Sequence, residues 1–146
     1  MEEIIKEKIS ADHLLYVSLK YTKTCDVILN LIFRWRIMIE RSVDAILYHA
    51  KKRKIISKIP VSPIEKIDLM KKLFQKHEII IKTIEVYEMF RKIDSLRYER
   101  EGEFRKNVNL RVFYMGREIN INMDKLKEYG DLLEKFISYV KQFLSS

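Results

Sequence analysis

The sequence predicts a mainly α protein, an up-and-down helical bundle of about five helices with one small β-hairpin inserted before the last helix. Three observations predict this fold class. Apolar side chains recur three and four residues apart over most of the chain, which is the spacing of helices that bury one face. Polar and apolar residues alternate only near residues 107–121. The chain contains only three glycines and two prolines. Its length of 146 residues fits a single domain over 1–146.

The first two helices are expected over residues 3–21 and 25–56. Residues 2–57 contain neither glycine nor proline. A single helix of that length would be ~80 Å long, whereas a domain of this size has a radius of gyration of ~15 Å. We therefore place a break at residues 21–24, where helix propensity is weakest and Thr24 can cap a new helix.

The predicted helix 25–56 carries apolar residues on two sides. One stripe at helical spacing comprises Ile28, Leu31, Ile32, Trp35, Met38, Ile39, Ala45 and Ile46, and a second comprises Leu29, Phe33, Ile37, Val43 and Leu47. A helix with two apolar sides needs two partners, of which one is its own core. The other is another helix of this chain or a second copy of the protein, because an uncovered apolar face favours aggregation. We predict a homodimer that forms through the region of Leu31, Trp35 and Met38.

Prolines and a capping residue mark the next helix. Pro60 and Pro63 are expected to end the second helix, because the residue before a proline disfavours the helical conformation. Ser62 then supplies an N-cap, with Pro63 at the first helical position and Glu65 completing a capping box. This arrangement predicts a helix over residues 63–75.

A further helix, expected over residues 78–96, is followed by a change of pattern. Residues 107–121 alternate around Met115-Gly116, which predicts a hairpin with about two residues at its tip. A lone hairpin is marginally stable in water, so we expect its apolar face to lie on the helices. That face comprises Val108, Leu110, Val112, Ile119 and Ile121. Asn122 can cap a last helix over residues 123–144.

Two of the three glycines have a clear place in this scheme. Gly116 fits the hairpin tip, and Gly102 lies in the loop before the hairpin. Gly130 lies inside the last predicted helix, and nothing in the sequence explains it.

The chain contains no segment that predicts export or membrane insertion. Its apolar runs fall short of the ~18–20 residues that span a bilayer, and residues 1–8 carry charges of both signs without a small-residue cleavage site. Cys25 is the only cysteine, so no internal disulfide can form. We predict a cytoplasmic protein with no membrane partner. Lys, Glu and Ile are abundant in the chain, and Gly, Pro and Cys are scarce. This archaeal-like composition recurs in proteins of hot-living organisms, and AT-rich genomes produce it too.

The sequence offers no catalytic centre. His13, His49 and His77 lie on separate predicted elements, and none has a partner at a metal-ligand spacing. Cys25 is expected to be a small buried hydrophobe rather than a reactive thiol. No glycine-rich phosphate loop is present, and the carboxylates mostly lie three or four residues from a lysine or arginine. We therefore predict no metal, no cofactor and no catalytic residue, which favours a non-enzymatic protein.

The net charge of +8 is concentrated in two places. A secondary basic cluster closes the second predicted helix, where cations are favoured by the helix dipole; it comprises Lys51, Lys52, Arg53, Lys54 and Lys58. The other concentration lies between Arg91 and Arg117. That stretch contains eight basic and four acidic residues, which gives it a net charge of +4. Six of the ten arginines of the chain lie there.

This arginine-rich segment is the candidate nucleic-acid-binding region. Arginine binds phosphate through a planar fork, and an aromatic side chain on the same face of the hairpin can stack on a base. The candidate residues are Arg91, Arg97, Arg100, Arg105, Lys106, Arg111, Phe113 and Arg117, with Tyr98 and Phe104 interleaved. The alternative is a salt-bridged surface, with Phe113 packed on a neighbouring helix or a second subunit.

The layout resembles that of the archaeal HEPN-like helical proteins. The resemblance rests on the order of the elements and on the phrase Ala11-Asp12-His13-Leu14-Leu15-Tyr16-Val17. It implies a small, often dimeric bundle that is either a ribonuclease or toxin, or a non-catalytic RNA-binding partner. The family's catalytic pair is an arginine and a histidine separated by four to six residues. Here the corresponding positions after Arg91 hold Leu96, Arg97 and Tyr98, and seven residues lie between Arg41 and His49, so the pair does not carry over.

Three functions are compatible with these observations. The first is a non-enzymatic dimeric binding module that contacts RNA through residues 91–117. The second is a HEPN-like ribonuclease that uses Arg91 or Arg97 with Tyr98 in place of the histidine. The third is a protein–protein adaptor with no nucleic-acid role.

Overall fold

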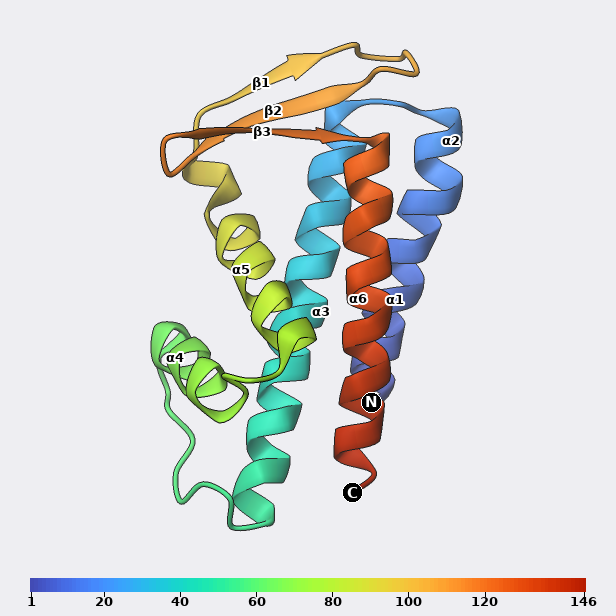
Figure 1. Ribbon diagram of the computed structural model, residues 1–146. Coiled ribbons are helices and arrows are strands. Elements are labelled where there is room, and N and C mark those ends of the chain that lie inside the picture. Colours follow the sequence, from blue (N-terminus) through green and yellow to red (C-terminus); the bar gives the residue numbers. More distant parts are fainter.

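The computed structural model describes residues 1–146 as a mainly α chain with one small antiparallel sheet before the last helix, which is the predicted fold class (Figure 1). The helical elements in chain order are α1 (Glu2–His13), a π-helical turn (Leu14–Ser18), α2 (Leu19–Tyr21), α3 (Cys25–Lys52), α4 (Pro63–Leu73), α5 (Glu78–Lys92), a 3₁₀ turn (Ile93–Ser95) and α6 (Met123–Leu144). The strands are β1 (Tyr98–Glu101), β2 (Asn109–Tyr114) and β3 (Arg117–Asn122).

The first predicted helix is confirmed as one rod, in which α1 continues through the π-helical turn into α2. The predicted break after it is confirmed as well. The Oγ1 atom of Thr24 accepts a hydrogen bond from the backbone N–H of Val27 at 3.3 Å and so caps α3. A local cap of this kind depends only on neighbouring residues, which is why the sequence predicts it correctly.

The predicted end of the second helix is wrong. The helix α3 ends at Lys52 rather than near residue 56, well before Pro60. Lys54 takes a left-handed backbone conformation with φ of 63°, and the N–H of Ile55 returns to the carbonyl of Ala50 at 2.8 Å. This is a left-handed helix end that glycine usually provides, so a lysine gives no sequence signal for it.

The next two helices agree with the predictions at their starts. Ser62 caps α4 by accepting a hydrogen bond from the N–H of Glu65 at 3.5 Å, and α4 ends at Leu73, two residues before the predicted end. The helix α5 begins at Glu78 as predicted. Its cap is His77, whose Nδ1 accepts from the N–H of Ile80 at 3.3 Å.

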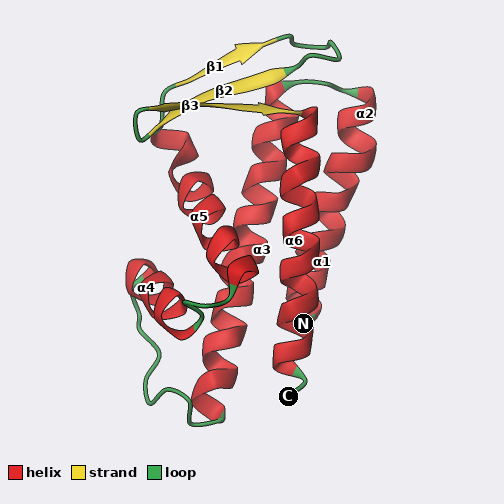
Figure 2. Cartoon of the chain, in the orientation of Figure 1, coloured by secondary structure: helices red, strands yellow, loops and turns green.

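The predicted hairpin is confirmed as β2 and β3, with the turn at Met115 and Gly116. Both turn residues have positive φ, 53° and 74°, as a tight two-residue hairpin turn requires. A third strand, β1, was not predicted; it pairs antiparallel with β2 and gives the order β1-β2-β3. The three-stranded sheet lies across the end of the bundle where α3 and α6 begin (Figure 2).

The predicted inner face of the hairpin lies against the helices. Val108, Leu110, Val112 and Ile121 are fully buried, and Ile119 is partly buried. The four buried residues belong to one cluster of 32 that includes side chains of every helix, and Ile119 packs against it. Near its middle, the ring of Trp35 stacks on Phe90 with 6.0 Å between centroids.

The region predicted to form a dimer interface lies inside the chain. Leu31, Trp35 and Met38 are 0%, 3% and 1% exposed, because other helices of the same chain cover them. Val43 and Leu47 of the second stripe are buried too, and Phe33 at 47% exposure is not. The two apolar sides of α3 therefore reflect its central place in the bundle rather than a contact of these three residues with a second copy.

The structure explains Gly130. A Cβ atom at this position of α6 would lie 3.1 Å from Cδ2 of Leu15 and 3.9 Å from Cζ2 of Trp35. The missing side chain therefore lets α6 approach the α1–α2 rod and α3 closely. No helix of the chain is long and apolar enough to cross a membrane.

Candidate nucleic-acid interface

The outer face of the sheet gathers several of the predicted arginines together with acidic residues. Arg111 lies at its centre, with Nη2 2.8 Å from Glu101, Nε 2.8 Å from Glu118 and Nη1 3.8 Å from Glu99. Antiparallel pairing places these residues on adjacent strands with their side chains on the same face. The guanidinium is surrounded by three carboxylates and does not present a free fork to a phosphate.

Phe113 shares this outer face with Arg111, as the alternation predicts. Within the chain, the guanidinium carbon of Arg97 lies 4.7 Å from the centroid of the Phe113 ring. Arg97 also pairs with Glu99 at 3.2 Å. With two arginines against Glu99, Glu101 and Glu118, this face has a charge of −1. The alternative of a salt-bridged surface therefore describes the outer face of the sheet better than a phosphate-binding ribbon does.

The other predicted residues are spread over different parts of the molecule. Arg100 is paired with Asp26 at 2.7 Å. Arg91 lies near the end of α5 and lines a small depression with Asp68 and Glu88. Arg117 lies at the hairpin tip, away from the β1–β2 connection that holds Arg105 and Lys106. The structure therefore does not bring the eight candidates together into one surface.

A second surface forms where the β1–β2 connection meets the α2–α3 connection (Figure 1). The backbone N–H of Phe104 donates to the carbonyl of Lys23 at 2.7 Å. The carboxylate of Glu103 accepts a hydrogen bond from the N–H of Cys25 at 3.2 Å, at the start of α3. The ion pair of Arg100 with Asp26 adds a third link. Segments about 80 residues apart in sequence are held together here by three polar contacts.

This surface, the corner surface, combines aromatic rings with cations that have no carboxylate partner, although Lys23 Nζ donates to the carbonyl oxygen of Lys20 at 2.7 Å. It comprises Lys20, Tyr21, Lys23, Phe104, Arg105 and Lys106. Tyr21 and Phe104 are each 77% exposed, which is unusual for such large apolar side chains. No carboxylate lies within ion-pair distance of the four cations, and the Nζ atom of Lys20 lies 5.7 Å from the centroid of the Tyr21 ring.

Phe104 is held in a strained conformation. Its φ of 66° lies in the left-handed region, which residues other than glycine and asparagine rarely adopt. The hydrogen bond to Lys23 and the turn at Gly102 hold the backbone there, so the Cα atom that carries the exposed ring has a fixed place. Strain of this kind is commonly stored at functional sites.

Three members of the corner surface escape sequence reasoning. Lys20, Tyr21 and Lys23 are isolated in sequence, and only the tertiary contact with residues 103–106 gives them basic and aromatic neighbours. Phe104, Arg105 and Lys106 lie within the arginine-rich segment that the sequence singles out. A local signal therefore exists for only one half of this surface.

The secondary basic cluster lies at the opposite end of the molecule. Lys51 and Lys52 end α3, whose first residue adjoins the corner surface, and a helix of 28 residues spans ~42 Å. Lys51, Lys52, Arg53, Lys54 and Lys58 are all exposed. The two basic regions do not form a continuous strip.

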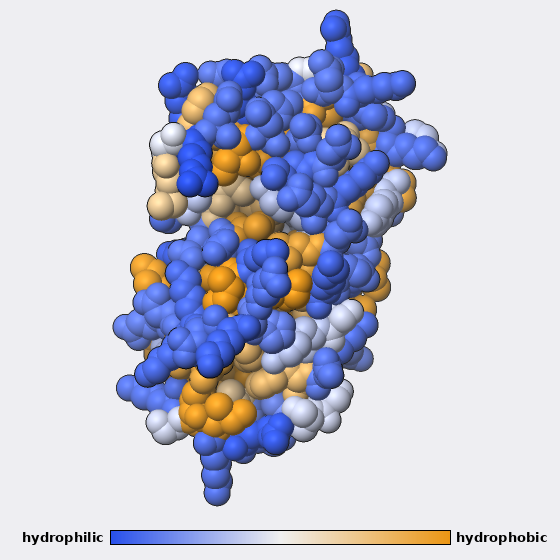
Figure 3. All heavy atoms as spheres, in the orientation of Figure 1, coloured by the Kyte–Doolittle hydropathy of each residue, from blue (hydrophilic) through white to orange (hydrophobic).

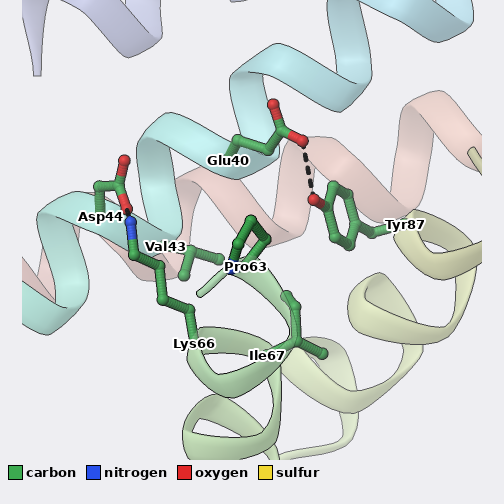
Figure 4. Close-up of a pocket in the computed structure, with 7 residues that line it drawn as sticks. All are labelled: Glu40, Val43, Asp44, Pro63, Lys66, Ile67 and Tyr87. Atoms are coloured by element: carbon green, nitrogen blue, oxygen red, sulfur yellow. Dashed lines mark hydrogen bonds and ion pairs between the residues drawn. The ribbon is translucent and has the colours of Figure 1, made fainter. Parts of the chain in front are cut away.

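A cavity of about 230 Å³ lies between α3, α4 and α5 (Figure 4). Its polar groups are already paired: the hydroxyl of Tyr87 donates to Glu40 at 2.7 Å, and Lys66 pairs with Asp44 at 2.7 Å. Burial, with the Glu40 carboxylate, raises the pKa of Tyr87 well above its usual value, so its hydroxyl keeps its proton. These contacts connect the three helices and leave no free group for catalysis.

The other candidate chemical groups are scattered. His13, His49 and His77 lie on different elements, and no group of three or more His, Cys, Asp or Glu side chains is placed to hold a metal ion. Cys25 is buried, and its Sγ lies 3.3 Å from the carbonyl oxygen of Asn109. Burial raises the pKa of this thiol to about 11, so it is not the activated thiol that a helix start can produce.

Comparisons with known protein families, with curated proteins and with solved structures find no significant match to this chain. The HEPN-like resemblance therefore stays a prediction from the order of elements and from residues 11–17.

Proposed function

We propose that this protein is a non-catalytic module that binds single-stranded RNA through the corner surface. The observation that carries the proposal is the pair of exposed aromatic rings, Tyr21 and Phe104, among four cations without carboxylate partners. Single-stranded nucleic acids bind where bases stack on aromatic side chains and cations follow the phosphate backbone. Each stacked base contributes about 1–3 kcal/mol.

The placement of the site differs from the sequence prediction. Arg105 and Lys106 remain in it, whereas Arg97, Arg100 and Arg111 are taken up by ion pairs with neighbouring carboxylates. A charge of −1 on the outer face of the sheet would repel phosphate. The corner surface has the opposite character, because none of its four cations has a carboxylate within ion-pair distance, and the adjacent carboxylates of Asp26 and Glu103 pair with Arg100.

RNA is favoured over other nucleic acids by two considerations. Unstacked bases are available in single strands, and the flexible loops of RNA present them most often. The resemblance to HEPN-like proteins, which include non-catalytic RNA-binding partners, supports the same choice.

The decisive experiment measures binding of a labelled oligouridylate by fluorescence anisotropy at two salt concentrations. We expect Phe104→Ala and Tyr21→Ala each to weaken binding by about 5- to 150-fold, the loss of one stacked base. Lys23→Gln should weaken binding and reduce its salt dependence. Met115→Ala is the matched control, because Met115 is 81% exposed at the opposite end of the sheet. No binding at low salt, or equal losses in the control, would overturn the proposal and favour the adaptor.

The ribonuclease alternative requires residues that the structure keeps apart. Arg97 stacks on Phe113 at the outer face of the sheet, whereas Tyr98 packs partly buried against the core. Arg91 lies on α5, outside the sheet. Incubation of the protein with labelled RNA tests this alternative. Cleavage that is lost in both Arg97→Ala and Tyr98→Phe would replace our proposal with the enzyme.

The homodimer stays part of the proposal, with its surface moved from α3 to α1. Ile9 and Tyr16, seven residues apart on the first helical rod, are 63% and 59% exposed, and Phe33 on the adjacent α3 is 47% exposed. A second copy would cover these side chains. Light scattering at micromolar concentration should give a dimer that Ile9→Lys dissociates and Met115→Lys does not. A monomeric wild type would remove the dimer and leave the RNA-binding surface unaffected.

A further inference from the structure

The segment that connects α3 to α4 combines charge and apolar exposure in a way that RNA binding does not use. This segment, residues 51–64, includes the last two residues of α3 and the first two of α4. The wider stretch of residues 45–64 contains five cations and no aspartate or glutamate. All five cations are exposed, and Lys51, Lys52, Lys54 and Lys58 have no carboxylate within ion-pair distance. The segment forms the end of the molecule opposite the sheet (Figure 1).

The same segment exposes aliphatic side chains. Val61, Ile64 and Ile55 are 90%, 57% and 52% exposed. Figure 3 shows apolar atoms at the lower end of the molecule, with hydrophilic atoms projecting beyond them. Isolated apolar residues on a surface need no explanation. Three exposed aliphatic residues within residues 55–64, in a lysine-rich segment, do need one.

The exposure has a structural cause. Ile56 and Ile59 are only partly exposed and pack against the core, and the N–H groups of Ile55 and Ile56 both return to the carbonyl of Ala50. These contacts fix the path of the segment. Its inward side is used for packing, and Ile55 and Val61 remain on the outward side.

We propose that this segment docks the protein on the surface of an anionic lipid membrane. Lysines near an anionic bilayer are each attracted to the headgroups, and exposed aliphatic side chains enter the boundary between headgroups and acyl chains. The composition favours a membrane over a nucleic acid, because residues 51–64 contain exposed aliphatic side chains, no aromatic ring, and four lysines against one arginine. The exposed ring of Tyr48 lies one helical turn before this segment, on α3.

This inference changes one prediction from the sequence. The sequence predicts no membrane partner because no segment is long enough to span a bilayer. Docking at the surface needs no spanning helix and agrees with the absence of one. The docking surface lies ~42 Å from the corner surface, at the other end of α3, so RNA and a membrane could be bound by the same molecule.

Co-sedimentation with lipid vesicles tests the inference. We expect the full chain to bind vesicles that contain phosphatidylglycerol and not vesicles of phosphatidylcholine alone, and to release them at high salt. The triple variant Lys51→Gln, Lys52→Gln, Lys58→Gln should bind about 100-fold more weakly, which corresponds to roughly fivefold for each cation. Val61→Asp should weaken binding roughly tenfold without affecting the fold, because this side chain is 90% exposed.

The control variant carries Lys20→Gln and Lys23→Gln at the corner surface. It should keep vesicle binding and lose RNA binding, whereas the triple variant should do the reverse. The inference is overturned if the wild type does not bind anionic vesicles, if it binds neutral vesicles equally well, or if the triple variant loses RNA binding instead. These outcomes are independent of the test of the corner surface, so either proposal can fail alone.

Discussion

Burial of a single thiol makes the stability of this protein sensitive to alkaline pH. The pKa of Cys25 is raised from 9.0 to about 11, chiefly by burial. Below pH 9 the thiol is neutral in the folded and unfolded states, so it has no effect. Above pH 9 the unfolded chain ionises first, and the free energy of unfolding falls until the folded thiol also ionises near pH 11.

We therefore expect the free energy of unfolding to fall by about 1 kcal/mol between pH 8 and pH 10. Urea denaturation at a series of pH values measures it. Cys25→Ala provides the comparison, because it cannot titrate; its starting stability is lower, but the fall between pH 8 and 10 should be smaller. The pKa of Tyr129, raised to about 12 by burial, adds a further fall above pH 10 in both proteins. Identical pH profiles of variant and wild type would contradict the assignment.

Two glycines with positive φ differ in what surrounds them. At Gly102 a Cβ atom would lie 2.6 Å from the carbonyl oxygen of Asn107, whereas at Gly116 nothing lies within 4 Å. Gly116→Ala should lower the free energy of unfolding by about 1 kcal/mol, because only backbone strain is added. Gly102→Ala should lower it by about 3 kcal/mol, because the loop must also move. Urea denaturation of the two variants measures the difference. Equal losses would show that the β1–β2 connection is less rigid than its contacts indicate.

Local chemistry explains which residues could be assigned from the sequence. The caps Thr24, Ser62 and Asn122 act on N–H groups three residues away, so the sequence alone identifies them. Gly130 depends on the approach of two other helices, and Tyr21 gains its basic neighbours from a distant loop. Residues of this second kind carry no local pattern.

At the scale of elements, β1 shows the same limit. Its sequence, Tyr98-Glu99-Arg100-Glu101, contains three charged residues and does not resemble a strand. What makes it a strand is pairing with β2 and the contact of its two outward glutamates with Arg111. The hairpin was predictable because its alternation and its Met115-Gly116 turn are local, whereas β1 depends on a partner ten residues away.

Arg111 is therefore expected to stabilise the sheet rather than to bind RNA. Arg111→Gln leaves Glu101 and Glu118 without an ion pair and Glu99 with Arg97 alone. Because these groups are partly exposed, we expect the free energy of unfolding to fall by about 1–2 kcal/mol, which is less than the loss when a buried ion pair is broken. Arg117→Gln at the hairpin tip, with no ion pair, should change stability by less than about 0.5 kcal/mol.

Binding distinguishes the two roles. Arg111→Gln should leave the affinity for oligouridylate unchanged once the protein is folded, because the sheet face is not the proposed site. A loss of RNA affinity comparable to that of Phe104→Ala would return the site to the hairpin, as the sequence predicts. Circular dichroism at the assay temperature provides the check that the variant is folded.

For the whole molecule, apolar periodicity was sufficient to predict the bundle but not to decide what covers each face of α3. Both stripes have helical spacing whether they face other helices or a second copy. The fold places α3 in the centre, so Trp35 and Met38 became core residues instead of an interface. The charge pattern has the same limit as the apolar pattern. A net charge of +4 over residues 91–117 does not show which of the cations already form ion pairs with neighbouring carboxylates.

Gly130 tests the packing of the whole bundle, because α6 meets both Leu15 and Trp35 at this residue. Gly130→Leu forces a large side chain between the helices and should lower the free energy of unfolding by about 1–3 kcal/mol. Gly130→Ala should stay within about 1 kcal/mol of wild type, since the gain in helix propensity opposes a contact of 3.1 Å with a movable leucine methyl. Lys127→Leu, an exposed position of the same helix, controls for the change of residue type. If Gly130→Leu were as stable as Lys127→Leu, the close approach of α6 to the α1–α2 rod would not contribute to the fold.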